Sequence, residues 1–128
     1  SIQRGHNAFV QVGCALCHTE SMTAGSSRIA ALSGKPVNMF SDLLVHNMGT
    51  ALADGVSQGN AGPDEFRSAP LWGLGQRIFF LHDGRTRDLL QAILAHDSPG
   101  SEADRSIDTF NQLSQSGRQD VLNFLRSL

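Results

Sequence analysis

The sequence has 128 residues, 40% of them hydrophobic and 17% charged, and a formal net charge of −2 at pH 7. A chain of this length fits one domain, residues 1–128, with a single core, and its near-neutral charge gives no reason to expect a nucleic-acid partner. Purely apolar stretches such as 78–81 are far shorter than a bilayer-spanning helix, so no membrane span is expected within the chain.

The first half of the chain predicts one short helix followed by long loops. Apolar residues spaced along 2–12, with Gly13 after them, predict a helix that ends just before the only two cysteines. Small and polar residues dominate 22–36, and glycines and prolines recur through 49–63. Both of these segments are expected to be loops.

Two more helices are expected in the second half of the chain. Thr86 is placed as the N-cap of a helix over 86–95 whose apolar residues follow helical spacing. Ser116 and Gln119 form a capping box ahead of an apolar terminal helix that reaches Leu128. No run alternates polar and apolar residues for long enough to predict a strand. The expected fold class is therefore all-α, with long loops that a prosthetic group in the middle would explain.

The two cysteines lie three residues apart, and a histidine follows the second one directly. The segment Cys14-Ala15-Leu16-Cys17-His18 is C-x-x-C-H, the attachment sequence of a c-type haem. On a tight turn, two thiols at this spacing can each add to a vinyl group on one porphyrin edge, while the neighbouring imidazole reaches the iron. The motif predicts one covalent haem c, attached through Cys14 and Cys17 and ligated by His18.

Two other kinds of site use paired cysteines at this spacing. A structural zinc ion needs two more ligands, usually from a second C-x-x-C or an H-x-x-x-H, and the sequence contains neither. A thioredoxin-like dithiol belongs to a βαβ setting, which the surrounding residues do not suggest. Haem attachment is the preferred interpretation, with zinc and dithiol sites as the alternatives.

Small and aromatic residues on the first and last predicted helices are placed to let these helices cross. Gly5 and Phe9 lie four residues apart on the first helix, and Phe124 and Leu125 lie on the last. A crossing built from these residues would suit one edge of a haem. Ordinary core packing would use the same residues and is an equal alternative.

Several longer motifs accompany C-x-x-C-H: FSDLLVHNMG at 40–49 with LADG at 52–55, FRSAPLWGLG at 66–75, LHDGR at 81–85, L-x-x-AI-x-x-H at 89–96 and FLRSL at 124–128. Together they resemble the C-terminal haem domain of di-haem cytochrome c peroxidase-like proteins and, most closely, their thiol oxidoreductase relatives. The resemblance implies a class I-like cytochrome c fold around one haem and a periplasmic or otherwise extracytoplasmic location. Because the relatives carry two haem domains, it also implies a redox partner protein or a second haem domain as the partner.

The iron of such a haem has a second axial position. The side chains able to fill it are those of His6, His46, His82, His96, Met22, Met39 and Met48. His96 lies four residues after Ala92 and seven after Leu89, on the buried face of the predicted helix. The resemblance also places a ligand at this position. His96 is therefore the preferred second ligand, and Met48 in the 40–49 motif is the alternative.

Two further side chains are candidates for contacts with the haem. The guanidinium of Arg67 matches the carboxylate fork of a propionate, a property that Arg77, Arg85 and Arg87 share. Trp72, close to a proline, is placed to pack on the porphyrin ring. Solvated surface for the arginines and plain burial for the tryptophan are the alternatives.

The predicted chemistry follows from the number of iron ligands. A haem iron with two protein ligands has no open position for a substrate, so single-electron transfer is the first functional hypothesis. The second is a haem domain of a di-haem peroxidase or oxidoreductase that supplies electrons to a reactive haem elsewhere. The residues leave open whether the chain is an enzyme in its own right.

Overall fold

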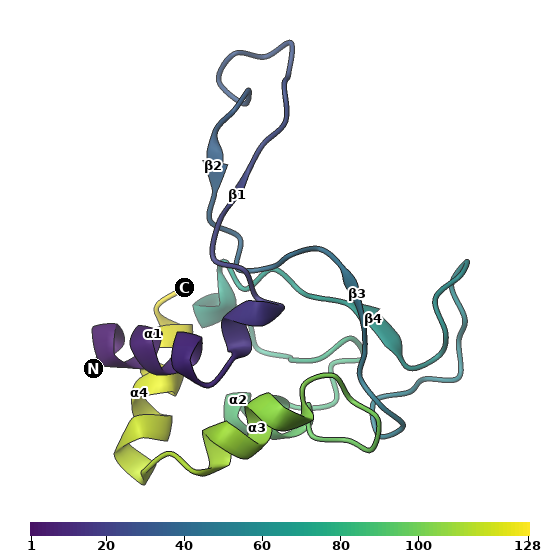
Figure 1. Ribbon diagram of the computed structural model, residues 1–128, viewed down its shortest axis with the longest axis vertical. Coiled ribbons are helices and arrows are strands. Elements are labelled where there is room, and N and C mark those ends of the chain that lie inside the picture. The colour runs from purple at the N-terminus through teal and green to yellow at the C-terminus, as the bar shows by residue number, and fades with distance from the viewer.

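The computed structural model describes residues 1–128 and combines four α-helices with two small antiparallel sheets. The α-helices are α1 (Ile2–Gln11), α2 (Leu89–Leu94), α3 (Asp104–Asn111) and α4 (Gln115–Arg126), and the 3-10 helices are η1 (Cys14–Leu16) and η2 (Leu74–Gln76). The strands are β1 (Met22–Thr23), β2 (Pro36–Val37), β3 (Val45–Asn47) and β4 (Glu65–Arg67). The four α-helices gather on one side of the molecule (Figure 1). None of the helices has the length and apolar character needed to cross a membrane.

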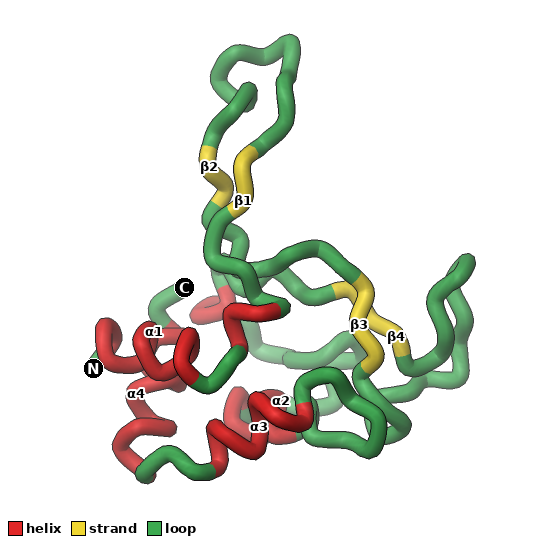
Figure 2. The backbone as a smooth tube through the Cα atoms, viewed as in Figure 1, coloured by secondary structure: helices red, strands yellow, loops and turns green.

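The two sheets show that the expected all-α fold class is wrong, because the structure is mixed α/β. β1 pairs with β2 at the base of a long arm, and β3 pairs with β4 (Figure 2). In the second sheet His46 lies opposite Phe66. Each strand has only two or three residues, which is too short for the two-residue alternation that reveals a strand in a sequence. The segments 22–36 and 49–63 otherwise form the long connections that their composition predicts.

The first and last helices cross at a glycine, as their small and aromatic residues predict. A Cβ on Gly5 would collide with the backbone carbonyl of Asp120 in α4, so only glycine allows this approach. Next to it, the rings of Phe9 and Phe124 meet edge to face with centroids 5.4 Å apart. Phe40 completes the aromatic cluster at 5.9 Å from Phe124. The crossing of α1 and α4 is confirmed, and it forms one end of the core.

The two predicted helices of the second half, α2 and α4, begin at other N-cap residues than those predicted. The carboxylate of Asp88 accepts two backbone N–H groups of the first turn of α2, at 2.8 and 3.3 Å, so Asp88 and not Thr86 is the N-cap. Ser114 caps α4 by accepting a backbone N–H at 3.1 Å, and the capping box of Ser116 and Gln119 is absent. In each case two good capping residues lie two positions apart, and sequence alone does not distinguish them.

α3 is a helix that the sequence analysis missed. Its buried residues, Ile107 and Phe110, lie three apart on one face, and Asp104 occupies its first turn. This spacing and the acidic first turn are the signals that could have revealed the helix. Phe110 is completely buried, so α3 contributes to the centre of the core.

Candidate functional site

A cavity of about 330 Å³ opens among the four helices, β3 and β4. Of its 31 lining residues 21 are hydrophobic, so the wall is mainly apolar. Phe9, Ala92, Phe110 and Val121 supply this wall from one α-helix each. Concave, mostly apolar pockets with a few converging polar groups are typical of cofactor sites.

The C-x-x-C-H motif lies in the wall of this cavity. Cys14, Cys17 and His18 all line it, and the two cysteines form no disulfide. Gly13 lies between α1 and η1 in the left-handed region, with φ of 99°, and lets the chain turn directly into η1. A Cβ on Gly13 would also lie 2.7 Å from the hydroxyl of Ser106 in α3. The glycine thus turns the motif toward the cavity and allows α3 to approach it.

The two thiols have the acid–base character of buried cysteines. Burial raises the pKa of Cys14 to about 11. Burial also raises the pKa of Cys17, and the negative charges of Asp42 and Glu102 raise it further. A redox-active dithiol instead depends on a lowered pKa that makes a thiolate available. The environment of these thiols therefore does not favour the dithiol alternative.

His18 is oriented by a backbone hydrogen bond to Phe40. Its Nδ1 donates to the carbonyl oxygen of Phe40 at 3.1 Å, and its Nε2 makes no hydrogen bond. Burial lowers the pKa of His18, and a charge on His96 would lower it further, whereas the backbone carbonyls of Phe40 and Ala69 oppose this in part. The ring is therefore neutral at neutral pH, with the lone pair of Nε2 available. A carbonyl that fixes Nδ1–H in this way is a common support for a metal-ligating histidine.

His96 has the same arrangement on another wall of the cavity. It follows α2, whose buried residues include Leu89 and Ala92, and it lines the same cavity as His18. Its Nδ1 donates to the carbonyl of Ala92 at 2.8 Å, and its Nε2 makes no hydrogen bond. Burial lowers the pKa of His96, which the Ala92 carbonyl partly opposes. Two neutral imidazoles with unused Nε2 atoms therefore share one apolar cavity.

The other candidates for a second iron ligand differ in what they contact. Met22, Met39 and His6 do not line the cavity, whereas His46, His82 and Met48 do. Both ring nitrogens of His46 are already paired with carboxylates, at 2.8 and 3.0 Å. The ring of His82 stacks on Phe66, with centroids 4.1 Å apart, and its Nε2 lies 3.8 Å from a carboxylate oxygen of Asp54. Among the cavity-lining candidates other than His96, Met48 is thus the one whose side chain is neither paired with a carboxylate nor stacked on an aromatic ring.

The two side chains expected to contact the haem periphery lie in different places. Arg67 is exposed, lines the cavity and has no carboxylate partner. Arg77 also lines the cavity, and its guanidinium donates to the backbone carbonyl of Pro70 at 2.8 Å. Trp72 is 52% exposed and does not line the cavity, so the structure does not bring it to the other site residues.

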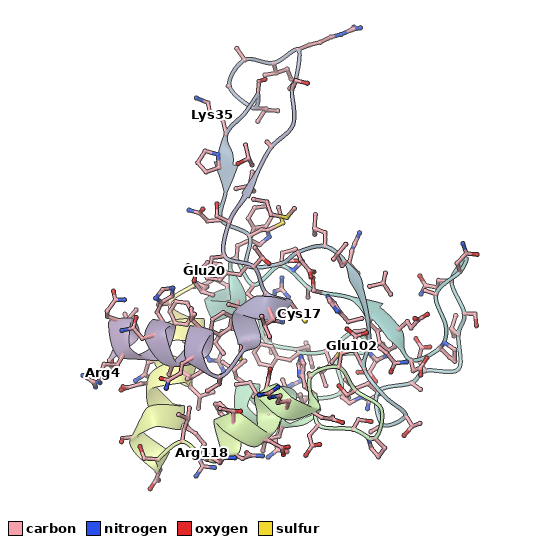
Figure 3. All side chains as sticks on the ribbon, in the orientation of Figure 1. Arg4, Cys17, Glu20, Lys35, Glu102 and Arg118 are labelled. Carbon is pink, nitrogen blue, oxygen red and sulfur yellow. The ribbon has the colours of Figure 1, made fainter.

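A polar cluster at the rim of the cavity was not foreseen from the sequence. His46 lies between the carboxylates of Asp42 and Glu102, and its Nδ1 is 3.7 Å from the sulfur of Cys17. Cys17 and Glu102 lie near each other in Figure 3. Burial alone would lower the pKa of His46, but the hydrogen bonds to Glu102 and Asp42 raise it. No local signal could have identified Glu102, which is 56 residues from His46.

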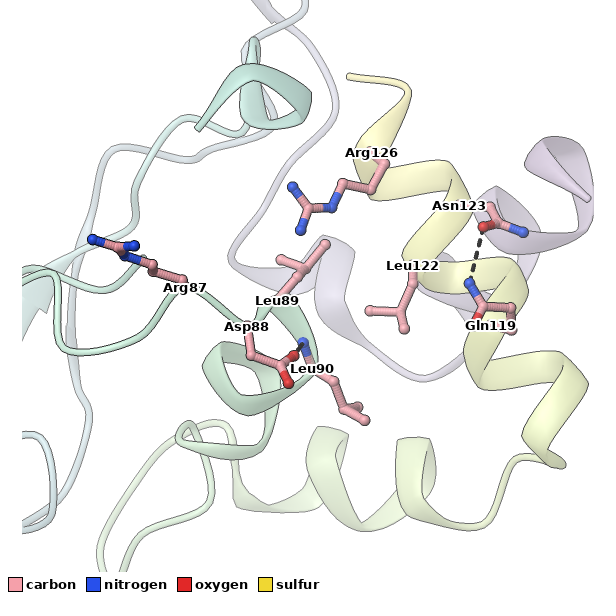
Figure 4. Close-up of a pocket in the computed structure, with 8 residues that line it drawn as sticks. All are labelled: Arg87, Asp88, Leu89, Leu90, Gln119, Leu122, Asn123 and Arg126. Carbon is pink, nitrogen blue, oxygen red and sulfur yellow. Dashed lines mark hydrogen bonds between the residues drawn. The ribbon is translucent and has the colours of Figure 1, made fainter. Parts of the chain in front are cut away.

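A second, more open groove lies between the start of α2 and α4 (Figure 4). It encloses about 500 Å³, and three of its eight lining residues are hydrophobic. Leu89 is common to this groove and the main cavity, but no cysteine, histidine or methionine lines the groove. The residues with haem-binding chemistry therefore belong to the main cavity. No group of three or more histidine, cysteine, aspartate or glutamate side chains that could hold a metal ion is present.

Comparison with known proteins identifies the family of the chain. No curated protein and no solved structure matches it. One family does match, and it covers residues 1–128, the whole chain. The chain therefore belongs to the family described as "Di-haem oxidoreductase, putative peroxidase", a family of haem-containing oxidoreductases.

Proposed function

We propose that residues 1–128 form one c-type cytochrome domain that holds a single covalent haem and transfers single electrons. Cys14 and Cys17 would attach the haem, and His18 and His96 would be its axial ligands, with Met48 as the alternative to His96. The observation that carries this proposal is the presence of two imidazoles in one apolar cavity with their Nε2 atoms unused. Both rings have the tautomer that metal ligation requires.

The residues around the cavity fit a haem in three respects. The thiols of Cys14 and Cys17 lie on a tight turn at the wall, where both can meet one porphyrin edge. The mainly apolar lining suits a large planar hydrophobic group and excludes water. Arg67 and Arg77 lie at the cavity without carboxylate partners and can bind the propionates.

Electron transfer follows from this set of ligands. When bound, a haem supplies reversible one-electron chemistry, and two protein ligands leave no open position for a substrate. The chain's own contribution is to orient both imidazoles through the carbonyls of Phe40 and Ala92 and to exclude water with its apolar wall. Histidine in place of methionine at the second position would keep the reduction potential lower than that of a similarly buried His/Met centre.

A second function concerns a larger assembly. The family is di-haem, whereas residues 1–128 contain a single C-x-x-C-H motif. This difference favours a role in which the domain supplies electrons to a reactive haem on a second haem domain or on a redox partner protein. Covalent haem attachment also supports a periplasmic or otherwise extracytoplasmic location. On its own, the domain is expected to be a poor peroxidase, because an axial ligand must leave before peroxide can reach the iron.

Optical and electron paramagnetic resonance spectra test the ligands, and a redox titration tests the electron transfer. The wild-type protein should be low-spin in both oxidation states and titrate reversibly with one electron. His96→Ala should convert the ferric protein to high-spin, whereas Met48→Ala should leave the spectrum unchanged. A low-spin His96→Ala protein would show that His96 is not the ligand, and loss of the low-spin spectrum in Met48→Ala would assign Met48 instead.

A further inference from the structure

A histidine held between two carboxylates spans the rim of the cavity. His46 Nε2 lies 3.0 Å from an oxygen of Asp42, and its Nδ1 lies 2.8 Å from an oxygen of Glu102. The His46 side chain is only 14% exposed. With a carboxylate on each nitrogen, the ring acts as a double donor and has no lone pair to offer to iron. Its place at the rim therefore calls for a role other than ligation.

The Asp42 end of this cluster is fixed to the segment that supports His18. The backbone N–H of Asp42 donates to the carbonyl of Cys17 at 2.9 Å. Two residues earlier, the carbonyl of Phe40 accepts the Nδ1–H of His18. The Asp42 carboxylate is held further by the hydroxyl of Ser68, at 2.5 Å. Movement of Asp42 would therefore disturb the haem motif itself.

The Glu102 end belongs to the loop that follows His96. The backbone N–H of Glu102 donates to the carbonyl of Asn47 at 2.9 Å, and the Glu102 carboxylate accepts the backbone N–H of Asn47 at 3.0 Å. Met48 and Ser101 form a bridge beside these bonds. Glu102 is the only side chain of this loop that reaches His46. The loop is also bonded to the residues after β3 through Ser98 and Pro99, but only the Glu102 carboxylate links it through His46 and Asp42 to the haem motif.

We propose that Asp42, His46 and Glu102 form a latch that holds the His96 segment against the His18 segment and so keeps His96 on the iron. The latch rests on the proposed function, because it acts through the bond between His96 and the haem iron. His46 and Glu102 are positioning residues in this role and do not touch the iron. If the cluster only stabilised the loop, removing it would lower the free energy of unfolding without changing how fast His96 leaves the iron.

Carbon monoxide binding to the reduced, haem-loaded full chain measures the strength of the latch. Carbon monoxide can bind only after His96 leaves the iron. The observed rate of carbon monoxide binding should therefore reach a maximum as its concentration rises, and this maximum equals the rate of His96 dissociation. Glu102→Ala removes the tie and should raise this limiting rate at least about tenfold, as expected for the loss of a charge-assisted hydrogen bond. Glu102→Gln keeps one acceptor oxygen for His46 but cannot also accept the Asn47 N–H, so it should restore part of the wild-type rate.

Glu20→Ala is the matched control. Glu20 pairs with His6 at 3.0 Å and does not line the cavity, so removing this pair should leave the limiting rate unchanged. Glu102→Ala and Glu102→Gln proteins that both keep the wild-type limiting rate would overturn the latch. If Glu102→Ala does not fold, a wild-type rate in Asp42→Ala, which removes the other carboxylate of the latch, would overturn it equally.

The same experiment separates failure of the latch from failure of the proposed function. His96→Ala should bind carbon monoxide without saturation, because its iron has an open position. If wild type shows no saturation, or if His96→Ala saturates at the wild-type rate, His96 is not the ligand and the latch is overturned together with the proposed ligation. If both proteins behave as expected while the Glu102 variants match wild type, the latch alone is wrong.

Discussion

The two sides of the cavity are held together by different kinds of contact. On the helical side, α1 and α4 meet through a glycine and an aromatic cluster that includes Phe9 and Phe124. On the loop side, β3, β4 and the loop after His96 are joined by short hydrogen bonds centred on His46. The comparison shows that apolar burial accounts for the stability of one side, whereas directional polar contacts fix the geometry of the other.

The largest expected effect is on the helical side. Phe9 is 2% exposed and packs on three aromatic rings, so Phe9→Ala should lower the free energy of unfolding by about 3–5 kcal/mol. Val10 on the same helix is 45% exposed, and Val10→Ala should change stability by less than about 0.5 kcal/mol. Denaturant unfolding of both proteins gives the comparison. Equal effects of the two substitutions would contradict a core built around Phe9.

A smaller loss is expected from closing the space at the helix crossing. Gly5→Ala should cost about 1–3 kcal/mol, because its Cβ meets the Asp120 carbonyl and forces the helices apart. Gly117→Ala in α4 meets only ordinary contacts at 3.4–3.9 Å and should be neutral or stabilising by up to about 1 kcal/mol. Thermal unfolding distinguishes the two, and a stabilised Gly5→Ala protein would show that the crossing is looser than described.

The loop side should show the smallest effect on stability, and its signature is pH dependence. The pKa of His46 is raised, so its contribution is present below its unfolded pKa of about 6.5 and is lost as pH rises through the folded value. The pKa values of Asp42 and Glu102 are lowered, so their contribution is lost as pH falls through their folded values. Unfolding measured across pH should therefore show a flatter alkaline slope in His46→Gln. An unchanged slope would mean that His46 does not titrate with folding.

The same contrast separates what the sequence predicts from what it does not. C-x-x-C-H and the four-residue spacing of Gly5 and Phe9 are local patterns, and they lead directly to the cavity wall and the helix crossing. The distance of His96 from Ala92 and Leu89 follows the helical period and predicts that His96 lies on their buried face, which is the cavity side. These features depend on neighbours within a few residues along the chain.

Apart from α3 and the two helix caps, the features that the sequence does not reveal depend on contacts between distant residues. β3 and β4 are three residues long and pair across a long loop, so no periodicity announces them. The pairing of His46 with Glu102 likewise arises only once the loop after His96 folds back onto β3. Trp72 was expected at the haem but is exposed and lies outside the cavity. Its place in a motif did not indicate the direction in which its side chain points.

The central claim, one covalent haem on Cys14 and Cys17, is tested most directly by denaturing mass spectrometry. The chain should be expressed with haem-attachment machinery, alongside the double variant Cys14→Ala/Cys17→Ala. Wild type is predicted to carry the added mass of one haem after denaturation, because thioether bonds survive it, and the double variant is predicted to carry none. Bare wild-type polypeptide under these conditions would contradict the account.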